Sequence, residues 1–235
     1  MLLAEFASGL AAVPVRADLA ADPPVVEMSR LPGVPLGGSP LTAAQADALV
    51  LALGRLWTAV PGTSLAGLGE AGANASQLTR QVAAMLTAQL DLDSHGLVRR
   101  AWQAGADWFR GGALDRLDAG DPVLGQGDSN LANFLWDGTE VRIVDFEDSG
   151  PSDRAFELAD LVEHISAWAD ARLPADVLLG SFGLTAAEQV RVREYRRLCA
   201  LFWLVMLLPG RPGHDRNPPG TLERQAARLL LLLGR

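Results

Sequence analysis

Hydrophobic residues change their spacing several times in the first 40 positions of the chain. Between residues 3 and 10 they recur every three or four positions, which predicts a short opening helix. Short apolar runs at residues 13–15 and 25–28 predict two strands. Residues 31–38 contain two prolines and three glycines, so we expect a connection built only from turns.

A helical pattern begins at Thr42. Thr42 and Gln45 have the spacing of a capping box, and apolar residues continue at helical intervals until Pro61. Two further helices are predicted over residues 75–91 and 95–111, the second ended by a pair of glycines.

Strands are expected again only between residues 123 and 146, and helices from about residue 153 to the end. This order predicts an α+β protein with two parts. Residues 1–33 would form a small strand-bearing part, and residues 34–235 a mainly helical body with an inserted β-hairpin.

Composition narrows the classes of function. The formal charge of −8 argues against a nucleic-acid partner, because phosphate backbones are bound by clustered basic residues. The longest apolar run, residues 198–208, is too short to cross a membrane.

Cys199 is the only cysteine, which excludes an internal disulfide and fits a cytoplasmic protein. The N-terminus lacks the pattern of a signal peptide. All twenty basic residues are arginine, so no ammonium side chain is present.

Polar residues concentrate between residues 123 and 148. A loop that contains Asp128 and ends at Asn133 is followed by two apolar segments around the turn at residues 137–140, which predicts a hairpin that exits at Asp145. A hairpin returns the chain to its starting point, so we expect Asp128, Asn133 and Asp145 to converge. Each residue alone is also typical of a turn, and only their combination favours a site.

Convergent oxygen ligands suit phosphoryl transfer, which depends on positioning and on metal charge. A carboxylate must meet the attacking hydroxyl, and we expect Asp128 to do so. Further oxygen atoms must hold Mg²⁺, and Asn133 and Asp145 are the candidates.

These residues resemble a known family. Gly127, Asp128 and Asn133, followed by the apolar segment that ends at Asp145, are similar to the catalytic loop and metal-binding segment of the aminoglycoside phosphotransferases, relatives of choline kinases and protein kinases. Residues 26–33 resemble the inter-lobe linker of that family.

The resemblance implies a protein-kinase-like fold with a truncated N-terminal lobe. It also implies that Asp128 is catalytic, that Asn133 and Asp145 bind Mg²⁺, and that ATP or GTP is the cofactor. The backbone of the linker would contact the nucleotide base, at Ser29, Arg30 and Leu31. The acceptor would be a hydroxyl of a small molecule, for which the acidic chain favours a cation. Four acidic residues are candidates to bind it: Glu147, Asp153, Glu157 and Asp160.

The sequence also departs from the family pattern. Gln126 stands where the family usually has histidine, and glutamine can still brace the loop through hydrogen bonds. No glycine-rich loop and no lysine precede the linker, although kinase-like enzymes use both to hold phosphates. Either an upstream segment is missing from the chain, or the protein lacks half of its nucleotide clamp.

Two alternatives to an enzyme therefore stay open: a pseudo-kinase that acts as a nucleotide-binding or regulatory module, and a purely structural helical domain. His164 is interpreted as structural or surface-exposed, and Trp203 as a packing residue. The identity of the acceptor and the oligomeric state are not predicted by the sequence.

Overall fold

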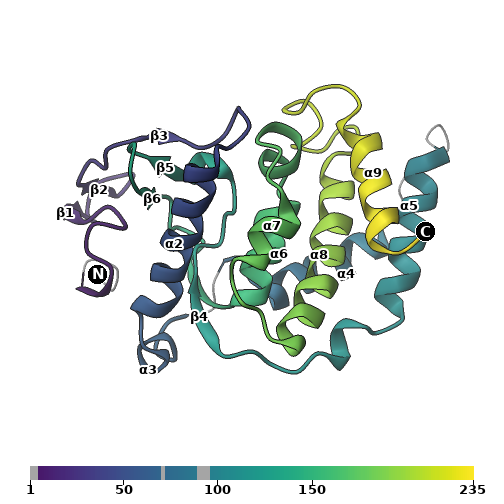
Figure 1. Cartoon of the computed structure of the whole chain (residues 1–235), viewed down its shortest axis with the longest axis horizontal. Coiled ribbons are helices and arrows are strands. Elements are labelled where there is room, and N and C mark those ends of the chain that lie inside the picture. The colour runs from purple at the N-terminus through teal and green to yellow at the C-terminus, as the bar shows by residue number, and fades with distance from the viewer. Residues whose placement is uncertain (1–4, 70–71, 89–95) are drawn as a thin grey trace.

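The computed structural model describes residues 5–69, 72–88 and 96–235. Most of its short strands lie at one end and helices α5, α8 and α9 at the other, and α2 stands beside the strands (Figure 1). The elements of the first half of the chain are β1 Pro14–Asp18, β2 Val25–Met28, β3 Val34–Pro35, α2 Ala43–Ala59, α3 Gly62–Leu65, α4 Ala75–Thr87, α5 Gly96–Arg110 and η1 Leu114–Arg116. They are followed by β4 Pro122–Gly125, η2 Leu131–Asn133, β5 Phe134–Trp136, β6 Val141–Ile143, β7 Gly150–Asp153, α6 Arg154–Glu163, η3 Ser166–Asp170, α7 Ala175–Gly180, α8 Ala186–Met206 and α9 Thr221–Leu232.

Three small antiparallel sheets make up the strand-bearing part of the described chain. β1 pairs with β2, β5 lies between β3 and β6, and β4 pairs with β7. The ribbon of β1 and β2 is exposed along its whole length, including Val15 and Val26, whose exposed fractions are 70% and 50%. The predicted strands at residues 13–15 and 25–28 are thus confirmed in place.

Helix α2 begins as the sequence predicts. The Thr42 hydroxyl accepts from the backbone N–H of Gln45 at 3.3 Å, and the Gln45 side chain accepts from the backbone N–H of Thr42 at 2.9 Å. This reciprocal cap satisfies two of the N–H groups that a helix N-terminus leaves unpaired. Helices α4 and α5 confirm the predictions over residues 75–91 and 95–111, although residues 89–95 lie outside the described part, as does Leu3 at the start of the opening helix.

Two strands lie where the sequence predicts none. β3 falls inside the segment expected to contain only turns, and β7 follows residue 146, where strands were expected to stop. Each exists because a distant partner supplies its hydrogen bonds: β3 pairs with β5, and β7 pairs with β4. Neither has the alternating apolar pattern of an autonomous strand, since β7 reads Gly, Pro, Ser, Asp.

The hairpin of β5 and β6 is stabilised at its turn by Asp137. Its carboxylate accepts from the backbone N–H groups of Thr139 at 2.9 Å and Glu140 at 2.8 Å. These bonds lower the pKa of Asp137, because they favour the charged carboxylate. Gly138 has φ +104°, a conformation that glycine adopts without strain. The hairpin predicted from the sequence is confirmed here.

Two buried apolar clusters lie side by side and share α6. One joins α2 and the β5 and β6 hairpin to Leu158, and the other joins α4, α5, α8 and α9 to Phe156. Helix α6 therefore contributes to both clusters, and its C-terminal end comes close to the loop that follows β4.

The first residues of the described chain pack against the hairpin. Leu10 is fully buried, and its carbonyl accepts from the backbone N–H of Ile143 at 2.9 Å. Gly33, at the proposed boundary between residues 1–33 and 34–235, has φ +121°, and a Cβ there would lie 2.9 Å from the Trp136 carbonyl. The boundary stays a proposal, because residues on both sides of it touch the hairpin.

Within the described residues, no helix combines the length and the apolar character needed to cross a membrane.

Candidate active site

The loop between β4 and β5 holds Asp128 through its own side chains. One Asp128 carboxylate oxygen accepts from the Asn130 backbone N–H at 3.0 Å, and the other accepts from the Asn133 amide at 3.0 Å. The same Asn133 amide also donates to the Asp128 carbonyl at 3.2 Å. Asp128 and Asn133 are therefore in direct contact, and the oxygen of the Asn133 amide remains available as a ligand atom.

Gln126 connects this loop to the end of β6. Its amide oxygen accepts from the Asp128 backbone N–H at 2.7 Å, and its amide nitrogen donates to the carbonyls of Asp145 at 2.6 Å and Val144 at 3.1 Å. The structure thus brings the Asp145 backbone beside the loop that carries Asp128. The Asp145 side chain is exposed, and its φ of +63° is unusual for a residue other than glycine.

Gly127 allows the loop to approach the segment after β6. It has φ +87°, and a Cβ at this position would overlap the Asp148 carbonyl. Glycine is the only residue without that atom, so it alone fits here without displacing its neighbours.

Glu157, in the first turn of α6, holds the start of the loop through hydrogen bonds. One carboxylate oxygen accepts from the Gln126 backbone N–H at 3.0 Å, and the other accepts from the Ser152 hydroxyl at 2.6 Å. Burial raises its pKa to about 7, with a smaller contribution from the negative charge of Asp160. Glu157 therefore lies beneath the loop, with both oxygens engaged inside the protein, and not on a surface open to a substrate.

The other three acidic candidates lie in different places. Asp160 lines a cavity beside Asp128. Asp153 caps α6, where it accepts from the Ala155 backbone N–H at 2.8 Å, and it pairs with Arg191 at 2.8 Å. Glu147 is exposed on the segment after β6. Of the four, only Asp160 shares a cavity with Asp128.

That cavity has a volume of about 230 Å³ and lies between α4, α6 and α8. Its walls carry three carboxylates and several aromatic rings: Ala73, Gln77, Leu78, Gln81, Gly127, Asp128, Asp148, Phe156, Asp160, His164, Phe202 and Trp203. Burial raises the pKa of Asp160 to about 6, and the charge of Asp128 acts in the same direction. Burial lowers the pKa of His164 to about 4, which keeps this ring neutral at pH 7.

Sequence reasoning missed most of these walls. The apolar positions of α4 and α8 predict helices, but nothing in their order indicates which face meets Asp128. His164 and Trp203 were interpreted as structural, and their rings do pack together, 4.9 Å apart and nearly perpendicular. That both residues also line the cavity became evident only from the tertiary structure.

The residues expected to contact a nucleotide base follow β2. The Ser29 backbone N–H donates to the Val13 carbonyl at 2.8 Å, and its hydroxyl accepts from the Val13 N–H at 2.8 Å. Ser29 therefore extends the β1 and β2 ribbon, while Arg30 is exposed and Leu31 is half-buried.

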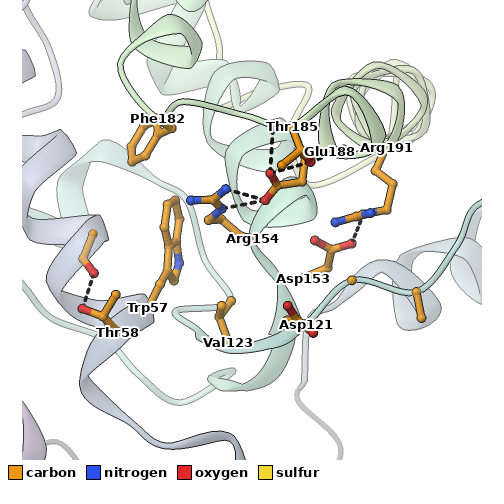
Figure 2. Close-up of a pocket in the computed structure, with 13 residues that line it drawn as sticks. Trp57, Thr58, Asp121, Val123, Asp153, Arg154, Phe182, Thr185, Glu188 and Arg191 are labelled. Atoms are coloured by element: carbon orange, nitrogen blue, oxygen red, sulfur yellow. Dashed lines mark hydrogen bonds and ion pairs between the residues drawn. The ribbon is translucent and has the colours of Figure 1, made fainter.

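A larger pocket of about 560 Å³ lies at the opposite end of β4, and Asp128 does not line it. Figure 2 shows Trp57 and Phe182 on one side and two ion pairs on the other, formed by Asp153 with Arg191 and by Glu188 with Arg154. Asp153 therefore belongs to this second pocket, away from the other candidate site residues.

Asn133 and Asp145 offer the oxygen donors that Mg²⁺ prefers. Across residues 5–69, 72–88 and 96–235, no three His, Cys, Asp or Glu side chains form a group able to hold a metal ion. Two protein ligands nevertheless suit Mg²⁺, because this ion keeps several waters and binds phosphate oxygens. The chemistry of the donors present thus fits the ion.

Residues 2–201 match the phosphotransferase enzyme family. The chain belongs to this family. No curated protein sequence matches this phosphotransferase, whereas many solved structures do.

Three of those structures illustrate the likeness. The GDP complex of aminoglycoside 2'-phosphotransferase-IIIa is 17% identical, with a TM-score of 0.63 over 99% of this chain and 78% of that one. A thermostable mutant of aminoglycoside phosphotransferase APH(4)-Ia, in a ternary complex with AMP-PNP and hygromycin B, is 15% identical, with a TM-score of 0.66 over 98% and 80%. A choline/ethanolamine kinase family protein from Mesorhizobium loti is 19% identical, with a TM-score of 0.56 over 97% and 74%. The α+β, protein-kinase-like fold expected from the sequence is confirmed, as is the family.

Proposed function

We propose that this phosphotransferase moves the terminal phosphoryl group of ATP or GTP to a hydroxyl of a small cationic molecule in the cytoplasm. The observation that carries the proposal is the position of Asp128. Its carboxylate is oriented by Asn130 and Asn133 and lines a cavity of about 230 Å³ that also contains Asp148 and Asp160.

Asp128 is assigned to orient the attacking hydroxyl and accept its proton. The carboxylate lies at the cavity, and the loop that carries it is tied to Asp145 through Gln126. Asn133 and Asp145 would hold Mg²⁺, which neutralises charge on the phosphates when it is bound. The linker at Ser29, Arg30 and Leu31 is assigned to the nucleotide, and related structures contain GDP or AMP-PNP.

The character of the cavity supports a cationic acceptor. Three carboxylates face a small volume, and the aromatic rings of Phe156, Phe202 and Trp203 complete its walls. Carboxylates attract an ammonium group, and aromatic faces add cation–π attraction. Related structures contain the amine-bearing compounds hygromycin B and kanamycin.

A phosphoryl-transfer assay with a set of hydroxylated amines, ATP, GTP and Mg²⁺ tests the proposal. Asp128→Asn should lower kcat by about 10² to 10⁴, because a positioned general base typically contributes that much. The matched control is Asp121→Asn, which removes an exposed carboxylate from the other pocket and should leave turnover unchanged. Asp145→Asn should raise the Mg²⁺ concentration needed for half-maximal turnover.

Equal turnover by wild-type protein and Asp128→Asn would overturn the assignment of Asp128. Magnesium-dependent nucleotide binding without a phosphorylated product, for every amine tested, would favour the pseudo-kinase alternative.

A further inference from the structure

A chain of hydrogen bonds connects the cavity wall to the catalytic loop. His164 follows the last residue of α6, and its Nδ1 lies 2.7 Å from the Ser166 hydroxyl oxygen. That oxygen accepts from the Leu131 backbone N–H at 2.9 Å. Leu131 lies between Asp128 and Asn133, so the chain ends within the loop that holds both residues.

The same contacts define the tautomer of His164. Nδ1 also accepts from the Ser166 backbone N–H at 3.2 Å. The Ser166 hydroxyl, while it accepts from Leu131, can donate its own proton to Nδ1. A proton on Nδ1 would face these two donors, so a neutral ring must carry its proton on Nε2. Burial, which lowers the pKa of His164 to about 4, keeps the ring neutral at pH 7.

Nε2 is on the opposite side of the ring from Ser166. Nε2 makes no hydrogen bond with any residue that the structure describes. The described nitrogen and oxygen atoms that are both buried and unpaired do not include Nε2, so this atom is accessible from outside the protein. His164 lines the cavity with the three carboxylates of Asp128, Asp148 and Asp160, so its N–H offers a donor that these acceptor groups do not supply.

We propose that His164 selects the phosphoryl acceptor, by donating its Nε2–H to an oxygen next to the reacting hydroxyl, and that Ser166 is the residue that positions the ring and the loop. The acceptor would therefore carry a second oxygen beside the hydroxyl that reacts. This inference rests on the proposed function.

The tautomer can be measured without any substrate. Long-range ¹H–¹⁵N spectra of ¹⁵N-labelled protein at pH 7 distinguish protonated from unprotonated ring nitrogens, and His164→Gln assigns the signals among three histidines. We expect a neutral His164 ring with its proton on Nε2. A proton on Nδ1, or a charged ring at pH 7, would overturn the proposal.

Acceptor selection is tested with two amines of nearly equal shape, 2-amino-1,3-propanediol and 2-amino-1-butanol, which differ by a hydroxyl in place of a methyl group. Wild-type protein should favour the diol in kcat/KM by about tenfold, the effect of one hydrogen bond in a buried site. His164→Leu should abolish this preference, and His164→Gln, which keeps a donor, should restore part of it.

Ser166→Ala should lower kcat for both amines alike and leave their ratio unchanged, whereas Ser166→Thr keeps the hydroxyl and should retain turnover. Thermal unfolding of every variant identifies any that fails to fold. Equal kcat/KM for the two amines in wild-type protein, or no transfer to either, would refute the role of His164. Loss of transfer in Asp128→Asn reports on the proposed function separately, because Asp128 acts on both amines.

Discussion

The side chain of Gln126 links the two segments that carry Asp128 and Asp145. It is 2% exposed, and its amide joins the Asp128 N–H to the Asp145 carbonyl. The sequence places this glutamine where related proteins usually have histidine, and predicts only that it could brace the loop. The two carbonyls to which it donates, those of Val144 and Asp145, are 18 and 19 residues away, so these partners became evident only with the fold.

Glu157 should make stability depend on pH. Its pKa is about 7 in the folded protein against 4.5 as the ordinary value, so the folded state binds more protons than the unfolded chain between these pH values. The contribution of this raised pKa to the free energy of unfolding is complete below pH 4.5 and is lost as pH rises through 7. The stability advantage of wild type over Glu157→Gln should therefore fall by about 2 to 3 kcal/mol between pH 5 and pH 8, at 1.36 kcal/mol per pKa unit.

Urea unfolding of both proteins at each pH measures this difference. The comparison with Glu157→Gln removes effects common to both proteins, including that of His164, whose lowered pKa acts in the opposite direction and stabilises at higher pH. An advantage that grows with pH would contradict the raised pKa of Glu157.

Among the elements, the loop and hairpin could be predicted from sequence, but the strands that flank them could not. Asp128, Asn133 and the turn at Asp137 lie within a few residues of one another, so their spacing in the sequence is enough to predict the loop and the hairpin. β3 and β7 depend on partners far along the chain, as do the cavity positions of His164 and Trp203. Local periodicity does not contain that information.

Two glycines test how tightly the elements around Asp128 are packed. Gly127 and Gly138 both have positive φ, but a Cβ at Gly127 would overlap Asp148, whereas no atom lies within 4 Å at Gly138. Both alanine variants should lose about 1 kcal/mol from backbone strain. Gly127→Ala should lose about 1 to 3 kcal/mol more from overpacking, and should also lower phosphoryl transfer.

Urea unfolding and the transfer assay measure both effects. Equal losses of stability in the two variants would show that the segment at Asp148 moves away readily.

On the scale of the whole molecule, α6 unites two apolar clusters. Leu158 is fully buried in the first cluster, and Phe156 packs on Tyr195 in the second with ring centroids 5.7 Å apart. A helix shared in this way should couple the two clusters in unfolding, because neither can lose its packing while α6 stays in place.

Leu158→Ala in the first cluster and Leu201→Ala in the second should each cost about 2 to 5 kcal/mol, since both side chains are fully buried. Each variant should shift one common transition, followed by tryptophan fluorescence and by circular dichroism in urea. Separate transitions for the two probes would mean that the clusters unfold independently.

The hydrogen bonds around Gln126 also bear on the entropy of catalysis. The Asp128 loop and the Asp145 strand end are joined by bonds formed entirely within the chain, before any ligand arrives. A ligand that binds there need not order this backbone, so little of its binding energy is lost to freezing the loop. The geometry that we assign to catalysis is thus preorganised, and differences in rate among acceptors should reflect their own fit to the cavity.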